Sequence, residues 1–93
     1  MMLGKVVGSI VATRKDERLV GQKLLLVEPL IRRGDGALDG DRDRMLVSVD
    51  VVGAGRGETV LLVSGSTARA AVSLPDSPID ACIIGIVDEV DLS

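Results

Sequence analysis

The chain has 93 residues, which is enough for one domain spanning residues 1–93 but leaves a small core, since a domain this short buries only about 60–65% of its unfolded surface. Hydrophobic residues make up 46% of the sequence, yet Phe, Tyr and Trp are absent, which excludes the aromatic stacking surfaces of single-strand nucleic-acid binders. The net charge is -3 and the basic residues are scattered among acidic ones, so we expect no nucleic-acid partner.

One cysteine and the lack of a long apolar run indicate the cellular compartment of the protein. Cys82 cannot form a disulfide within the chain, and a lone cysteine is typical of a reducing, intracellular compartment. No apolar run reaches the roughly 18–20 residues that cross a bilayer, and Gly4, Lys5, Gly8 and Ser9 interrupt any export signal. We expect a soluble, cytoplasmic protein with no membrane partner, whose small core is completed by oligomerisation.

Short segments rich in Val, Ile and Leu alternate with polar, glycine-containing connections, which predicts strands and turns. Glycines in the first segment predict a bend or bulge there. Pro29 predicts an edge or bulge near the end of the second segment, because proline cannot donate to a ladder. The predicted strands are residues 3–13, 22–31, 45–52, 58–64 and 79–92.

Three connections have distinct compositions. Residues 32–44 hold three glycines and four aspartates, which predicts a long, mobile hairpin connection. Residues 53–57, GAGRG, predict a hairpin between the third and fourth strands. The residues after the fourth strand predict one short helix with Ser66 as its N-cap and with Pro75 and Pro78 stopping it.

Five strands with one short helix leave no room for crossover helices between parallel strands. The sequence therefore predicts an all-β fold, a small five-stranded antiparallel barrel of the partly open type.

Most catalytic and metal-binding arrangements are missing. Histidine is absent, which removes the usual general base, the usual zinc ligand and the Ser–His and Cys–His nucleophile pairs. Cys82 lies in an apolar strand, where an inert thiol is expected. We expect no enzyme activity, no cofactor and no metal site.

Residues 39–43, DGDRD, have the alternating acids of a calcium loop. However, Arg44 stands where that loop needs glycine, no predicted helices flank the run, and Asp50 at its twelfth position belongs to a strand. We interpret the run as a solvated hairpin tip.

Residues 49–63, VDVVGAGRGETVLLV, place glycines at alternate positions between two strands. Gly53, Gly55 and Gly57 match neither the dinucleotide fingerprint nor the phosphate loop, and Glu58 would repel a phosphate. Two interpretations remain open: a purely structural hairpin, and a loop whose backbone approaches another chain closely.

Five blocks of the sequence carry a family resemblance. They are residues 4–15, GKVVGSIVATRK; 23–30, KLLLVEPL; 49–58, VDVVGAGRGE; 64–69, SGSTAR; and 80–88, DACIIGIVD. In this order the blocks resemble the EutN/CcmL family, the pentameric vertex proteins of bacterial microcompartments and carboxysomes. The resemblance covers most of the chain and fades in residues 32–44.

The resemblance implies an OB-like barrel assembled as a cyclic homopentamer. The ring would cap the vertices of a polyhedral microcompartment shell in the cytoplasm, beside hexameric and pseudohexameric shell proteins. A flat layer of hexagonal tiles cannot close without fivefold units, and a cyclic ring of heterologous contacts supplies one. The glycine-rich loop is then expected at the pentamer interface or around its axis, with small residues because larger ones would collide: Gly53, Ala54, Gly55 and Gly57.

Charged residues are expected to contribute further contacts. Glu58 and Arg69 are candidates for an ion pair between subunits. Arg14, Lys15 and Asp16 are candidates for contacts to neighbouring shell tiles. The alternative function is an OB-like module that binds nucleic acid or a ligand, which would need a basic or aromatic face.

Overall fold

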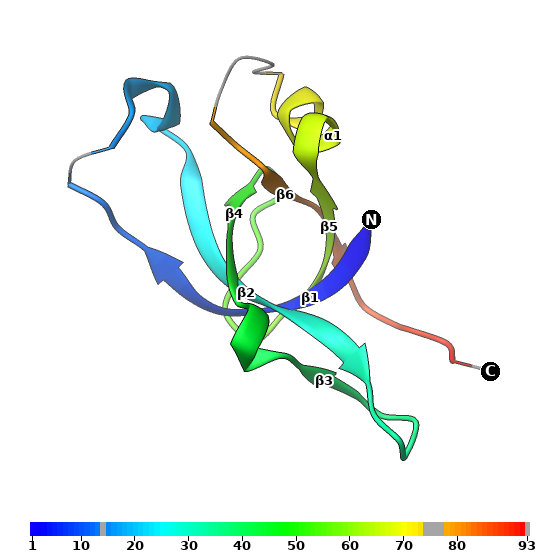
Figure 1. The fold of residues 1–93 in the computed structure, drawn as a ribbon. Helices are drawn as coiled ribbons and strands as arrows, with labels where there is room; N and C mark the ends of the chain where they lie inside the picture. Colours follow the sequence, from blue (N-terminus) through cyan, green and yellow to red (C-terminus); the bar gives the residue numbers. More distant parts are fainter. Residues whose placement is uncertain (14, 74–77, 93) are drawn as a thin grey trace.

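The structure, a computed structural model, describes residues 1–13, 15–73 and 78–92. Strands dominate it, with two 3-10 turns and one short helix (Figure 1). The elements are β1 (Met2–Ile10), η1 (Glu17–Leu19), β2 (Lys23–Arg32), β3 (Leu38–Gly40), η2 (Arg42–Arg44), β4 (Leu46–Asp50), β5 (Thr59–Ser64), α1 (Gly65–Ala71) and β6 (Ala81–Val87).

Five strands close into a barrel in the order β1-β5-β6-β4-β2 and back to β1. Four of the pairings are antiparallel, whereas β4 and β6 make a short parallel pairing in which Asp50 lies opposite Ile83. The predicted five-stranded barrel with one short helix is confirmed. The sequence did not predict that the barrel is closed or that one pairing is parallel. Both features arise because β6 lies between β4 and β5 and pairs with each of them.

The predicted long connection, residues 32–44, is the outer part of a hairpin on β2. Both β3 and β4 pair with β2, with Leu30 opposite Gly40 in the outer part. The 3-10 turn η2 separates β3 from β4 at the level of Pro29, whose carbonyl accepts a hydrogen bond from the Asp41 N–H at 2.8 Å. Pro29 therefore lies at a ladder irregularity, as predicted, and the hairpin projects from the barrel (Figure 1).

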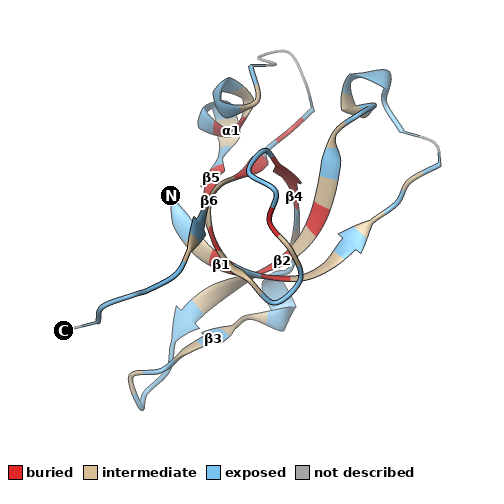
Figure 2. Cartoon of the chain, turned by 180° about the vertical axis from the view of Figure 1, so that it is seen from behind, coloured by how far each residue is buried: buried red, intermediate tan, exposed pale blue. Residues whose placement is uncertain are grey.

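Apolar side chains form two clusters, one inside the barrel and one outside it. Figure 2 shows buried segments on the barrel strands and on α1. The inner cluster is Val6, Leu25, Val27, Ala54, Val60, Leu62 and Ile83. The outer cluster, packed beneath α1, is Val49, Val63, Ala68, Ile79 and Cys82.

Glycine in β1 lets the barrel close tightly. A Cβ at Gly4 would lie 2.5 Å from Cγ1 of Val27 and 2.9 Å from Cδ1 of Leu62. The register between β1 and β2 shifts between Val6 and Gly8, which is the irregularity that the glycines predicted. These two features curve β1 around the core.

The helix α1 begins earlier than predicted. Its N-cap is Ser64 and not Ser66, because β5 runs directly into the helix at Gly65 without an intervening turn. The helix ends well before Pro78, and the predicted stop at Pro75 lies outside the described residues. The last strand is also shorter than predicted, because β6 ends at its seventh residue and 88–92 continue outside any strand.

Candidate functional site

The glycine loop, residues 51–58, connects β4 to β5 and crosses the mouth of the barrel (Figure 2). The predicted hairpin is wrong, because β6 lies between β4 and β5 and those two strands, both fully described, do not pair with each other. Ala54, at the centre of the loop, is 1% exposed and packs into the inner cluster. The loop therefore plugs its own barrel.

Asp50, the last residue of β4, holds the first half of the glycine loop. Its carboxylate accepts hydrogen bonds from the N–H groups of Val52 and Ala54, at 3.0 and 2.8 Å. Lys23, opposite Asp50 on β2, lies 3.4 Å from this carboxylate and donates to the Ala54 carbonyl at 2.9 Å. The Asp50 side chain is fully buried while that of Lys23 is half exposed, so the buried charge is compensated by hydrogen bonds and one cation.

Sequence analysis missed the Asp50–Lys23 pair. The available signal was an acid within the apolar run of residues 47–52, VSVDVV. A charged residue between core-facing positions is rarely buried without a partner.

The second half of the glycine loop is tied to β1. The N–H of Gly57 donates to the carbonyl of Val6 at 2.8 Å, and the N–H of Val6 donates to the carbonyl of Glu58 at 3.0 Å. The Glu58 carboxylate accepts a hydrogen bond from the Gly55 N–H at 2.6 Å. Both ends of the loop are therefore fixed by contacts within one chain.

The glycines of the loop have different roles inside the chain. Gly53 and Gly57 have φ angles of 80° and 89°, a region that side chains rarely adopt. A Cβ at Gly55 would meet, among the described atoms, only the Glu58 carboxylate oxygen Oε1, at 3.3 Å. Backbone conformation thus explains two glycines, and close approach by another subunit at Gly55 stays a prediction.

Glu58 and Arg69 are not paired with each other within the described chain. Glu58 binds the glycine loop, and Arg69, on α1, donates to the carbonyl of Ile79 at 3.1 Å. Arg69 therefore fastens α1 to the segment before β6. An ion pair of these two residues between subunits stays a prediction.

The predicted tile-contact residues belong to the arm between β1 and β2 (residues 11–22), which extends from the barrel (Figure 1). Arg14 lies outside the described residues. Lys15 is exposed and donates to the carbonyl of Ala12 at 3.0 Å. Asp16 caps η1 and pairs with Arg18 at 2.7 Å, and hydrogen bonds from Arg18 hold the pKa of the Asp16 carboxyl well below its usual range.

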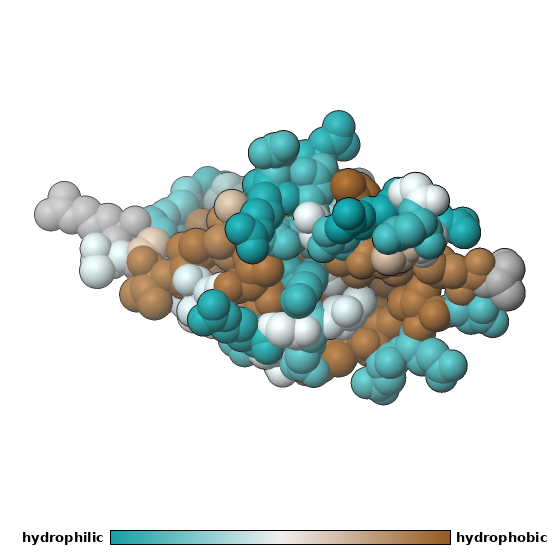
Figure 3. Space-filling view, turned by 90° about the horizontal axis from the view of Figure 1, so that it is seen from below, coloured by the Kyte–Doolittle hydropathy of each residue, from teal (hydrophilic) through white to brown (hydrophobic). Residues whose placement is uncertain are grey.

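An apolar row lies on the outer face of β1, β2 and β4. Leu26 of β2 stands between Gly8 of β1 and Val47 of β4, and opposed residues in antiparallel strands share a face. Val47 is 44% exposed and the nearby Met45 is 47% exposed. Hydrophobic residues also appear between hydrophilic ones on the underside of the molecule (Figure 3). This outer row (Gly8, Leu26, Met45, Val47) is a candidate contact surface.

A groove of about 160 Å³ adjoins the outer row. Its walls come from η1, β2, β4 and the segment leading into β6, and they are mostly apolar. The lining residues are Leu19, Leu24, Val47, Val49, Pro78, Ile79, Asp80 and Ala81. The apolar surface of β4 therefore continues into a concave site.

The remaining chemical candidates are engaged in local structure. Cys82 is buried, and desolvation together with the charge of Asp50 raises the pKa of its thiol, as expected for a packing residue. Asp39 pairs with Arg33 at 2.9 Å, and Asp41 caps η2. Within the described ranges, no three Cys, Asp or Glu side chains gather as a metal site. In the same ranges, no helix is both long and apolar enough to span a bilayer.

Comparison with known sequences places these features in a family. The family model described as ethanolamine utilisation protein EutN/carboxysome matches residues 1–88. The bacterial microcompartment shell vertex protein EutN of Escherichia coli K12 is 49% identical over 90 residues, which cover 97% of this chain and 90% of that protein. The carboxysome shell vertex protein CcmL of Synechocystis PCC 6803 is 43% identical over 93 residues, covering 100% of this chain and 88% of that protein.

Comparison with solved structures gives the same result. The GrpN pentameric microcompartment shell protein from Rhodospirillum rubrum superposes with a TM-score of 0.81 at 45% identity. The match covers 100% of both chains. Over its full length, this chain therefore has the fold of a pentameric shell protein.

Proposed function

This chain belongs to the EutN/CcmL family, whose members include bacterial microcompartment and carboxysome shell vertex proteins, and we propose that five copies close into the ring that caps a shell vertex. The observation that carries this function is the end-to-end match to a pentameric shell protein. It places the protein in the shell of a bacterial microcompartment as a structural component.

The outer row and its groove support a ring built from heterologous contacts. In a cyclic ring each subunit presents two different surfaces, one to each neighbour. The partly exposed Leu26, Val47 and Met45 form an apolar surface on a chain whose own core is small. Burial of this surface by the next subunit would contribute about 25 cal/mol for each Å² of apolar area removed from water.

The glycine loop contributes to the ring at Gly55. Gly53 and Gly57 serve the backbone conformation and Ala54 serves the chain's own core, so Gly55 is the loop glycine that neither the backbone conformation nor the core requires. A glycine at this position would let a neighbouring backbone approach closely. Glu58 is the last residue of the loop and Arg69 lies on α1, and we assign them as a secondary ion pair between subunits.

The partners of the ring are hexameric and pseudohexameric shell proteins. The arm of residues 11–22 projects from the barrel with Lys15 and Asp16 exposed, which suits a contact made outside the ring. A ring of five among hexagonal tiles supplies the curvature that a closed polyhedron needs.

The proposed role involves no catalysis. The relatives are named as shell vertex proteins, and the chain lacks histidine. The carboxylates closest to the glycine loop, Asp50 and Glu58, are used to hold that loop in place. The names of the relatives, the missing histidine and the use of these two carboxylates all fit a structural role.

Co-expression with hexameric shell proteins tests this function. With the intact chain, electron microscopy is expected to show closed polyhedral particles. Without it, or with a variant that carries Val47→Lys in the outer row, open sheets, tubes or particles with missing vertices are expected. Particles whose vertices are closed equally well in the absence of this chain would contradict the proposed function.

A further inference from the structure

The C-terminal segment, residues 88–92, carries concentrated negative charge. Residues 79–92 contain four acids and no base, in a chain whose net charge is only -3. Residues 88–92 belong to no helix or strand, and they run away from the barrel (Figure 1). Val90 and Leu92 are 39% and 42% exposed. The segment is therefore an extended acidic peptide with partly exposed apolar side chains.

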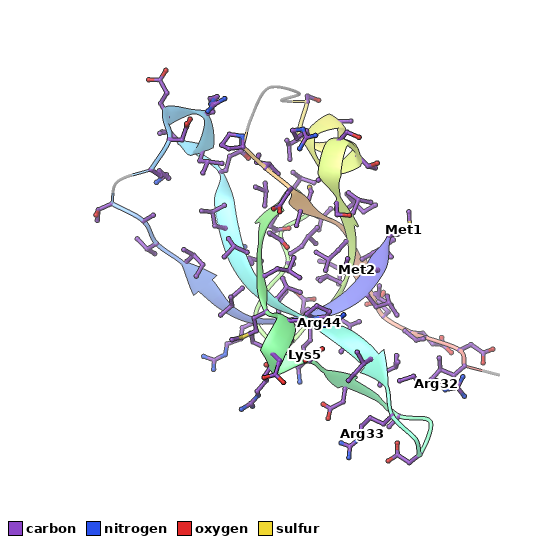
Figure 4. All side chains as sticks on the ribbon, viewed as in Figure 1. Met1, Met2, Lys5, Arg32, Arg33 and Arg44 are labelled. Atoms are coloured by element: carbon purple, nitrogen blue, oxygen red, sulfur yellow. The ribbon has the colours of Figure 1, made fainter. Side chains whose placement is uncertain are left out.

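Cations gather in a notch beside β1. A notch of about 480 Å³ lies between β1, η2 and the glycine loop, a volume in the range of sites that hold small ligands or short peptide segments. Lys5, Arg42 and Arg56 line it, and Val7 and Met45 provide apolar surface. Lys5 lies at the base of η2, close to Arg44 in projection (Figure 4).

The notch holds two cationic side chains, Lys5 and Arg56, whose charges are not paired with a described acid. Its one acidic lining residue, Glu28, is 8% exposed, lies 3.4 Å from Arg42 and packs against Gly40. No described residue makes an ion pair or hydrogen bond with the side chain of Lys5 or Arg56. Two exposed cations therefore face a notch whose acid is already compensated.

We infer that the notch of one subunit receives the C-terminal segment of the next subunit in the ring, with Asp88 and Glu89 facing Lys5 and Arg56. This inference rests on the proposed pentamer. The two surfaces have opposite charge and each has apolar side chains, and they are different patches of one chain, which is what a cyclic contact requires.

The segment of the same chain does not occupy its own notch. Val87, the last residue of β6, lies opposite Thr59, and Thr59 lies opposite Lys5. Val87 is thus separated from Lys5 by β5, and the segment that follows Val87 heads outward (Figure 1). A neighbouring subunit can supply the same peptide from the other direction.

Charge reversal and its restoration test the contact. One variant carries Lys5→Glu with Arg56→Glu, a second carries Asp88→Lys with Glu89→Lys, and a third carries all four changes. Each reversal is expected to raise the concentration at which half of the rings dissociate by roughly tenfold, and the fourfold variant is expected to recover most of this loss. Arg32→Glu, an exposed cation outside the notch, is the matched control and should leave the ring unchanged.

Several outcomes would overturn the inference. Rings of normal stability after either reversal would do so, and so would losses that add up in the fourfold variant instead of cancelling. In these cases the intact protein would still be pentameric, so the proposed function would stand. Circular dichroism of each variant separates loss of the ring from loss of the fold.

Chemical cross-linking identifies the chain that supplies the segment. A variant with Arg56→Cys and Glu89→Cys, treated with a short reagent that joins two thiols, is expected to give covalent species of up to five chains. Each single variant should give none, because the native Cys82 is buried. A reagent bridge within one chain, or efficient bridging to another shell protein in place of a second copy, would contradict the inference.

Discussion

The carboxylate of Asp50 lies 3.4 Å from the ammonium of Lys23, and together they hold Ala54 of the glycine loop by its N–H and its carbonyl. The carboxylate is fully buried and the lysine is half exposed. This pair fixes the glycine-rich connection across the barrel mouth, and the position of the half-buried Gly55 depends on it.

Replacement of Asp50 should destabilise the folded chain. In Asp50→Asn the amide can accept only part of the hydrogen bonding now made to Val52 and Ala54, and the attraction to Lys23 is lost. We expect the free energy of unfolding to fall by about 1–3 kcal/mol. Urea unfolding measures this free energy. Both proteins are compared at one fixed concentration, because ring assembly also adds to the apparent stability. Asp43→Asn, on the exposed η2 turn, should change stability by less than about 0.5 kcal/mol, and an equal loss there would refute the assignment.

Gly4 should be the β1 glycine least able to carry a side chain. The Cβ of Gly4→Ala would lie 2.5 Å from Val27 and 2.9 Å from Leu62, so the core must shift, at a cost of about 1–3 kcal/mol. Gly8→Ala in the same strand meets only Leu26 Cβ, at 3.9 Å, and should be nearly neutral. Thermal unfolding of the two variants compares them directly. Equal melting temperatures would show that the barrel interior has more room than the structure indicates.

Ser48 carries a hydroxyl that the fold does not use. The residue is 0% exposed, and its Oγ has no hydrogen-bond partner among the described residues. Ser48→Ala removes a buried polar group without opening a large cavity, so the free energy of unfolding should stay constant or rise by about 1 kcal/mol. Differential scanning calorimetry provides the measurement. A clear loss of stability would mean that the hydroxyl has a partner in the assembled protein.

Gly55→Leu should weaken assembly more than folding. Inside one chain the Cβ of the new side chain meets only the Glu58 carboxylate, which can move, so the barrel should lose about 1 kcal/mol or less. At a subunit interface the same side chain would collide with a neighbour. Analytical ultracentrifugation should show dissociated but folded chains. Gly53→Leu is the contrasting variant, since its φ of 80° makes any side chain strain the fold itself. Normal assembly of Gly55→Leu would refute an interface at this residue.

The strands could be predicted from the sequence because alternating Val, Ile and Leu leave a local signal. The order of the strands left no such signal. Residues 53–57 have hairpin composition, yet β6, from the far end of the chain, lies between the two strands that they join. The pairing of β6 with β4, in which Val49 lies opposite Cys82, is parallel, and it closes the barrel.

The candidate site could be predicted only in part, for a related reason. The composition of the glycine loop marked it as special, but the residues that hold it, Lys23 and Asp50, are far apart in sequence and meet only across the ladder of β2 and β4. The outer row could not be predicted, because a strand with apolar residues on both faces does not reveal which face packs into the core and which is exposed. The proposed assembly contacts at Gly55, Glu58 and Arg69 come from the family resemblance and would involve a neighbouring chain, so they stay predictions.

The mass of the intact protein in solution tests the central claim most directly. Native mass spectrometry at micromolar concentration should give one dominant species of five times the 9.7 kDa chain. A folded monomer that persists at high concentration, with the outer row and Gly55 open to water, would contradict the account.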